Sequence, residues 1–141
     1  MSERFNLAWN EFDKCTSLAF RDLLSETDFA DVTLVCDDDK QFTAHKVVLS
    51  ACSSFFKRIL LRNPHQKPLL YMRGMKHEDI AAILSFMYTG QAEVNQDNLD
   101  NFLKAAREMK VNGLNEDTNH EQKTERLVDN FTFSKNCPEQ L

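Results

Sequence analysis

The sequence lacks any long hydrophobic run. No apolar stretch approaches the roughly 18 residues that a helix needs to cross a bilayer. The polar start MSERFN also lacks the apolar core of a signal peptide. We therefore expect a nuclear or cytosolic protein with no membrane partner.

An excess of positive charge is also missing. Seventeen lysines and arginines are outnumbered by 22 aspartates and glutamates, which gives a net charge of −5. Proteins that follow a phosphate backbone usually carry a broad basic surface. The composition therefore argues against direct nucleic-acid binding by this chain.

Closely spaced metal ligands are absent as well. Cys15, Cys36, Cys52 and Cys137 are far apart, no Cys-x-x-Cys occurs, and the four histidines are equally dispersed. Tetrahedral zinc usually takes its ligands from two close pairs. We expect no metal site and no cofactor, and we interpret the thiols as small buried apolar groups.

What the sequence contains is the pattern of an α+β domain. With 42% hydrophobic and 28% charged residues, 141 residues suit one compact domain. Phe5, Leu7 and Trp9 alternate with polar or small residues, as in a strand with one apolar side. From Glu11 to Glu26 the apolar spacing becomes three or four residues, which predicts an amphipathic helix.

Short strands and helices follow in the rest of the chain. The patterns predict a hairpin over 32–44, helices over 45–52 and 54–62 with Ser53 as N-cap, a strand over 69–72, and helices over 76–88 and from Asn95 to Gly113. From residue 115 the sequence turns polar, and we expect a flexible tail or linker over 115–141. The alternative is a segment of this tail that docks on the domain, since the tail contains the apolar residues Leu127, Val128, Phe131 and Phe133.

Several motifs in fixed order resemble the BTB/POZ domain. They are DFADVTLVCDDDKQFTAHKVVLSACSSFF, ILSFMYTGQAEV and FLKAAREMKVNGL, while FNLAWNEF resembles the start of the insect Tramtrack-type subgroup of transcription and chromatin regulators. The resemblance covers residues 4–114. One departure is Ser53-Ser54, where the subgroup usually has Ser-Pro; without that proline the helix start is less preorganised.

The resemblance implies a helical cluster flanked by a short mixed β-sheet, in an obligate homodimer that exchanges its leading strand. It also implies larger assemblies, mixed dimers with other BTB proteins, corepressor or chromatin partners, and a nuclear location. We expect the dimer interface to consist of Phe5, Leu7, Trp9, Phe12, Ala19, Phe20, Leu23 and Leu24. Independently of the resemblance, five of them offer more apolar surface than a peripheral element of a small domain should expose: Trp9, Phe12, Phe20, Leu23 and Leu24.

The segment TAHKVVLSACSSFFKRIL contains a histidine, a thiol and hydroxyls, the ingredients of nucleophilic catalysis. If a helix begins near His45, however, Cys52 lies about 10 Å farther along its axis, and no nucleophile elbow is nearby. We interpret the segment as a packing element in which Ala44, Val47, Val48, Leu49, Ala51 and Cys52 fill the core. His45 should then bind local partners, and no enzyme activity is expected.

Two sets of charged residues are candidate binding sites. Asp31 and Lys46 match the paired acidic and basic positions of a pocket at the BTB dimer interface, and the pair is either structural or a contact for corepressor peptide. Lys57, Arg58 and Arg62 lie in a stretch from Ser54 to His77 with six cations and no acid. This stretch is either a solvated face or a patch for an acidic partner.

Two functions compete. The first is an oligomerisation module of a transcription or chromatin regulator. The second is a substrate adaptor for a cullin-type ubiquitin ligase, another role of BTB domains. Such adaptors usually carry a hydrophobic-x-Glu motif after the third helix, whereas LRNPHQKPLLYM has no acidic residue. The sequence therefore favours the first function and leaves the second open.

Overall fold

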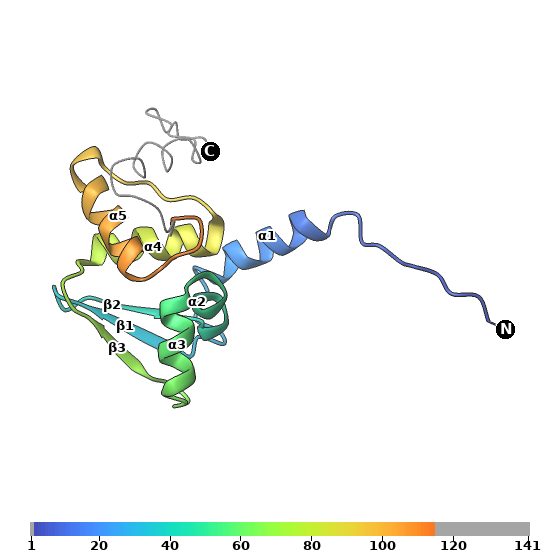
Figure 1. The fold of residues 1–141 in the computed structure, drawn as a ribbon, viewed down its shortest axis with the longest axis horizontal. Coiled ribbons are helices and arrows are strands. Elements are labelled where there is room, and N and C mark those ends of the chain that lie inside the picture. Colours follow the sequence, from blue (N-terminus) through green and yellow to red (C-terminus); the bar gives the residue numbers. More distant parts are fainter. Residues whose placement is uncertain (1, 115–141) are drawn as a thin grey trace.

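The computed structural model describes residues 2–114. They form a three-stranded sheet packed with helices, and an N-terminal helix that extends away from this body (Figure 1). In chain order the elements are α1 (Phe12–Leu23), β1 (Val32–Cys36), β2 (Gln41–Ala44), α2 (Lys46–Cys52), α3 (Ser54–Arg62), β3 (Leu69–Met72), α4 (His77–Thr89), the 3-10 helix η1 (Gln96–Asn98) and α5 (Leu99–Glu108). The predicted α+β fold is confirmed. None of the described helices is long and apolar enough to cross a membrane.

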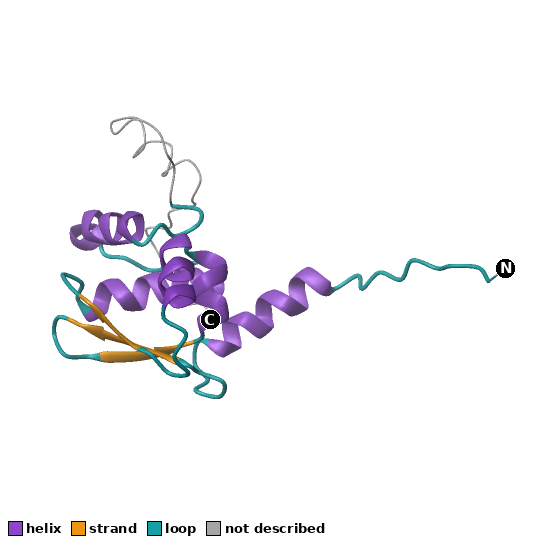
Figure 2. Ribbon diagram, turned by 60° about the horizontal axis from the view of Figure 1, so that its bottom comes forward, coloured by secondary structure: helices purple, strands orange, loops and turns teal. Residues whose placement is uncertain are grey.

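The central strand of the sheet is β1. It pairs antiparallel with β2 and parallel with β3, so that Leu34 lies opposite Phe42 on one side and Leu70 on the other. Val32, Leu34 and Cys36 are buried, whereas the side chains between them are half-buried. Because successive side chains of a strand point to opposite faces, one face of the sheet packs on the helices (Figure 2).

Helix α4 supplies much of the core. It buries four apolar side chains at the predicted helical spacing, Ile80, Ile83, Leu84 and Met87, together with Tyr88. Gly90 ends the helix with a φ of 80°, a left-handed conformation that glycine adopts without a Cβ clash. The chain then returns through η1 to α5, whose buried side chains complete the core.

Ser53 joins three helices. Its buried Oγ accepts the Phe56 N–H at 3.1 Å and donates to the carbonyl of Met109 at the end of α5. Beside it, the backbone N–H of Asn112 donates to the Cys52 carbonyl at 2.7 Å. The predicted N-cap is confirmed, and the same hydroxyl holds the chain after α5 against the α2–α3 junction.

Replacing Ser53 by alanine is expected to lower the free energy of unfolding by about 2 kcal/mol. The substitution removes the N-cap of α3 and leaves the Met109 carbonyl without this donor in the core. Ser54→Ala, at the neighbouring exposed position, is the control and should cost less than about 0.5 kcal/mol. Urea unfolding at one fixed protein concentration measures both. Equally small losses for the two variants would contradict the role of Ser53.

The first 30 residues differ most from the sequence prediction. The helix predicted over Glu11 to Glu26 spans Phe12–Leu23, because the N–H groups of residues 24–26 bind carbonyls three residues earlier and form tighter turns. Residues 2–9 form no strand in the single chain. A strand needs a neighbour to bind its backbone groups, so the strand at Phe5–Trp9 stays a prediction. The tail predicted at 115–141 lies outside the described residues.

The prediction that Val47 and Ala51 fill the core is wrong. Val48 and Leu49 are buried, but Val47 is 69% exposed and Ala51 is exposed too. A two-turn helix presents only one face to the core. Val47 and Ala51 are four residues apart and therefore share the opposite face.

Candidate protein-interaction surface

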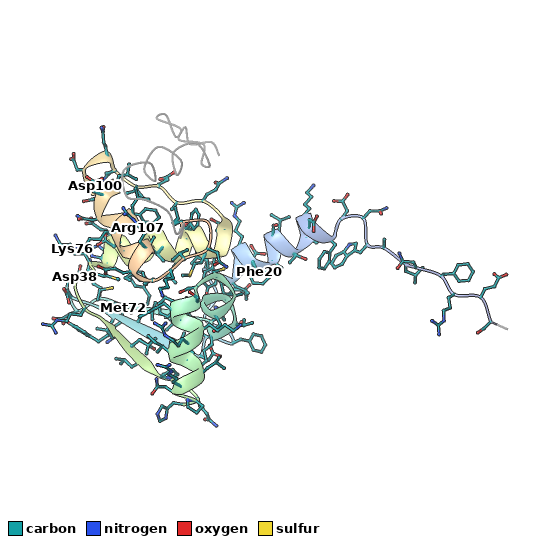
Figure 3. All side chains as sticks on the ribbon, in the orientation of Figure 1. Phe20, Asp38, Met72, Lys76, Asp100 and Arg107 are labelled. Atoms are coloured by element: carbon teal, nitrogen blue, oxygen red, sulfur yellow. The ribbon has the colours of Figure 1, made fainter. Side chains whose placement is uncertain are left out.

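Helix α1 carries apolar side chains that its own chain does not cover. None of its residues is buried. Leu23 is half-buried and packs against the core, whereas Phe12, Phe20 and Leu24 are exposed by 53%, 37% and 39%. Figure 3 places Phe20 on the half of α1 nearest the body of the domain. Leu23, one of the predicted interface residues, therefore packs within its own chain.

The segment before α1 extends this uncovered surface. Phe5 and Leu7 are exposed by 80% and 91%, and Trp9 packs only the edge of its ring on Phe12, with 5.4 Å between the ring centroids. Together these residues form what we call the N-terminal apolar surface: Phe5, Leu7, Trp9, Phe12, Ala19, Phe20 and Leu24. Exposed apolar side chains in this number mark a site of protein association.

Asp31 and Lys46 lie together, but not as the expected ion pair. Asp31 Oδ1 accepts the backbone N–H of Lys46 at 2.7 Å, and so satisfies one of the free N–H groups at the start of α2. Lys46 Nζ donates instead to the carbonyl of His65. Within residues 2–114 no ion pair joins the two side chains. Both residues are half-buried, so a partner could still contact them.

His45 is buried between two partners from distant parts of the chain. The Tyr88 hydroxyl accepts the His45 backbone N–H at 2.9 Å and lies 2.8 Å from ring Nδ1, while ring Nε2 lies 3.0 Å from the Asp28 carbonyl. Because that carbonyl only accepts, Nε2 carries the proton and Tyr88 donates to Nδ1. The prediction that protein groups occupy the ring nitrogens of His45 is confirmed, but these partners are distant in sequence rather than local.

This arrangement leaves the catalytic interpretation without a base. Both ring nitrogens of His45 are occupied, and Cys52 Sγ lies 3.6 Å from the Met87 carbonyl. Burial raises the pKa of the Cys52 thiol, which disfavours the thiolate that a nucleophile requires. Among residues 2–114, Cys52 thus has no contact that would activate it.

Sequence patterns gave no sign of the turn at Phe29. The Ala30 N–H donates to the Thr27 carbonyl at 3.1 Å, and Phe29 takes a φ of 62°, which is unusual for a bulky residue. Its side chain is 89% exposed. The turn is held in place because the carbonyl of Asp28, within it, accepts a hydrogen bond from buried His45. Only the folded backbone reveals this further exposed aromatic side chain, which lies outside the N-terminal apolar surface.

The three predicted basic residues do not form one patch. Lys57, Arg58 and Arg62 are all exposed on α3 and take part in no ion pair in the described part of the chain. Successive helical residues are rotated by 100° about the axis. Arg58 and Arg62, four residues apart, therefore share one side of α3, and Lys57 points elsewhere.

The acidic turn between β1 and β2 is structural. Asp37 accepts the Gly74 N–H at 2.8 Å and the Tyr71 hydroxyl at 3.0 Å, and Asp38 binds the ring of His77. Figure 3 shows Asp38 and Lys76 at the same end of the sheet. The hydrogen bond from His77 holds the pKa of Asp38 below its ordinary value. Residues 2–114 contain no cluster of three potential metal ligands.

Comparisons with known proteins agree with this geometry. The BTB/POZ domain family matches residues 20–126. In Drosophila melanogaster, protein abrupt is 45% identical over 112 residues, or 79% of this chain, and longitudinals lacking protein-like is 43% identical over 114 residues, or 81% of this chain. The alpha isoform of protein tramtrack is 36% identical over 115 residues, or 82% of this chain.

The chain spans very different shares of these relatives. It covers 12% of the length of abrupt and 14% of that of tramtrack, but 89% of longitudinals lacking protein-like. Among solved structures, the BTB domain of human gigaxonin superposes with a TM-score of 0.66 over 81% of this chain and 93% of that domain, at 22% identity. A shared fold, a family match over most of the chain and a relative aligned nearly end to end show that this protein belongs to the BTB/POZ family.

Proposed function

We propose that this chain is an oligomerisation module that binds a second copy of itself through the N-terminal apolar surface and carries out no catalysis. The observation that carries the proposal is the exposure of α1, a helix of twelve residues with no buried side chain. Such a helix gains little by folding alone, since helical stability in proteins comes mostly from packing an apolar face. A dimer interface that resembles a divided core would supply that packing.

We further propose that the leading segment pairs with the sheet side of the partner. Phe5, Leu7 and Trp9 alternate with a polar and a small residue, which is the pattern of a strand with one buried face. Residues 91–95 have no regular secondary structure, yet Ala92 and Val94 are half-buried while Gln91 and Glu93 are exposed. Residues 5–9 of one chain and residues 91–95 of its partner therefore both alternate like strands. Pairing between them would give each segment a strand neighbour. Further exchanges of this kind would build larger assemblies.

Mixed dimers and corepressor contacts belong to the same proposal. Asp31 and Lys46 lie at the start of α2, where Val47 exposes its side chain, and this region would meet a dimer partner or a bound peptide. The related Drosophila proteins and the Tramtrack-type motifs support a role in transcription or chromatin regulation in the nucleus, with other BTB proteins as partners. The acid-free α3–β3 loop is the reason that we do not propose a cullin adaptor.

Deleting residues 4–10 is expected to lower the oligomeric mass of the purified protein, because the exchanged strand and three apolar side chains are lost together. A finer variant replaces Phe5, Leu7 and Trp9 by serine, and its control replaces Arg4, Asn6 and Ala8 by serine on the alternate positions. Light scattering across a concentration series gives the masses. An unchanged mass for the deletion would refute strand exchange.

A further inference from the structure

A groove opens between α3, β3 and the end of α5. Its apolar walls are Phe55 and Ile59 of α3, Leu70 and Met72 of β3, and Met75 and Met109. It encloses about 270 Å³, slightly below the size at which small-molecule pockets usually begin, roughly 300 Å³. The groove thus suits a few protruding apolar side chains better than a cofactor.

The chain leaves the described region beside this groove. Met109, in the groove wall, accepts the hydrogen bond of Ser53, one residue before α3 begins. Asn112 is bound to the Cys52 carbonyl, and Leu114 is still 2% exposed. Twelve residues, 115–126, then separate Leu114 from the apolar cluster at Leu127. They span up to about 40 Å, compared with a radius of gyration of about 13 Å for a domain of this size.

The net charge around the groove is opposite to that of the chain after residue 114. Arg73 and Glu108 both line the groove. Arg58 and Arg62 share the side of α3 that carries Phe55 and Ile59, at spacings of three, four and seven residues. Between Ser54 and His77 there is no acidic residue. Residues 115–133 contain two basic and five acidic side chains, a net charge of 2 − 5 = −3. The tail is thus opposite in sign to the net charge of the rim, where Arg58, Arg62 and Arg73 outnumber Glu108.

We propose that segment 127–133, LVDNFTF, docks into this groove of its own chain. Leu127, Val128, Phe131 and Phe133 supply apolar side chains for its walls, and the acidic residues before them lie along the arginines. Covalent attachment by a short linker gives the segment an effective concentration in the millimolar range, so even a weak contact is occupied. This inference does not depend on the dimer, whose proposed surface lies on α1.

Hydrogen exchange on the full chain tests the docking. In the variant Phe131→Ser/Phe133→Ser, amides of β3 and of the first turn of α3 are expected to exchange about tenfold faster than in the unchanged protein. The control variant Asn130→Ser/Thr132→Ser alters the residues between them and should leave these rates unchanged. Equal exchange in the two variants would overturn the proposal. Oligomeric mass should be the same in both, which separates this result from the test of the dimer.

Photo-crosslinking identifies the occupant directly. A benzoylphenylalanine at position 133 is expected to link to peptides of α3 or β3. Mixing chains labelled with ¹⁴N and ¹⁵N distinguishes links within one chain from links between chains. Links within one chain to the groove support the proposal. Links only between chains, links to another surface, or no links would each overturn it.

Discussion

Replacing both Phe20 and Leu24 by aspartate should turn the proposed dimer into a monomer at micromolar concentration. Truncating a side chain at the centre of an interface costs about 2 kcal/mol or more. Two such losses correspond to about 4 kcal/mol, or about a thousandfold weaker association. The carboxylates add to this loss because the partner would desolvate them without a counter-charge. The effect acts on assembly, since both side chains are exposed in the single chain.

Sedimentation velocity across a concentration series measures this change. Lys14→Asp is the matched control, because it lies on α1 outside the N-terminal apolar surface and also changes the net charge by −2. The control should keep the dissociation constant of the unchanged protein within about threefold, as expected for a peripheral charge. A double variant that dimerises as tightly as the control would exclude α1 from the interface.

Tyr88→Phe is expected to destabilise the domain by about 3 kcal/mol. Tyr88 is 3% exposed, and its hydroxyl serves His45 twice, by accepting its backbone N–H and donating to Nδ1. Its removal leaves two buried polar groups without partners, and each such group costs about 1–3 kcal/mol. Tyr71→Phe is the control, since that hydroxyl bonds Asp37 at the surface and should matter by less than about 1 kcal/mol.

Alkaline pH gives an independent readout of the same hydroxyl. Burial raises the pKa of Tyr88 to about 12, above the ordinary value of 10.0. A raised pKa means that its contribution to stability is complete below pH 10 and is lost as the pH rises toward 12. The free energies of unfolding of the unchanged protein and of Tyr88→Phe should therefore converge over this range. A constant difference from pH 9 to pH 12 would contradict the buried position of the hydroxyl.

Local patterns were enough to predict most of the elements. β-Favouring residues and helical spacing predicted the outer bounds of the β1–β2 hairpin and those of β3, α3 and α4 to within one residue. The Ser53 cap was also predictable, because an N-cap depends on a few neighbouring residues. These features are set over a few residues of sequence, where composition and spacing are direct evidence.

Features that depend on the assembled chain could not be predicted in this way. The exposure of Val47 depends on which face of α2 meets α4, and the conformation of Phe29 depends on a turn held by His45 from a later segment. The side chain of Lys46 binds the carbonyl of His65, whereas Asp31 is bound by the backbone N–H of Lys46. Each outcome results from a competition between partners far apart in sequence.

The bare surface of α1 has a consequence for the amount of protein in a cell. If that surface is hidden only in pairs, the assembled fraction at low abundance grows with the square of the number of chains rather than in proportion to it. Halving the gene dose would then remove about three quarters of the active pairs. Quality-control proteases would meet the surplus single chains with an exposed helix. The number of assembled pairs would then fall more steeply than the expression level.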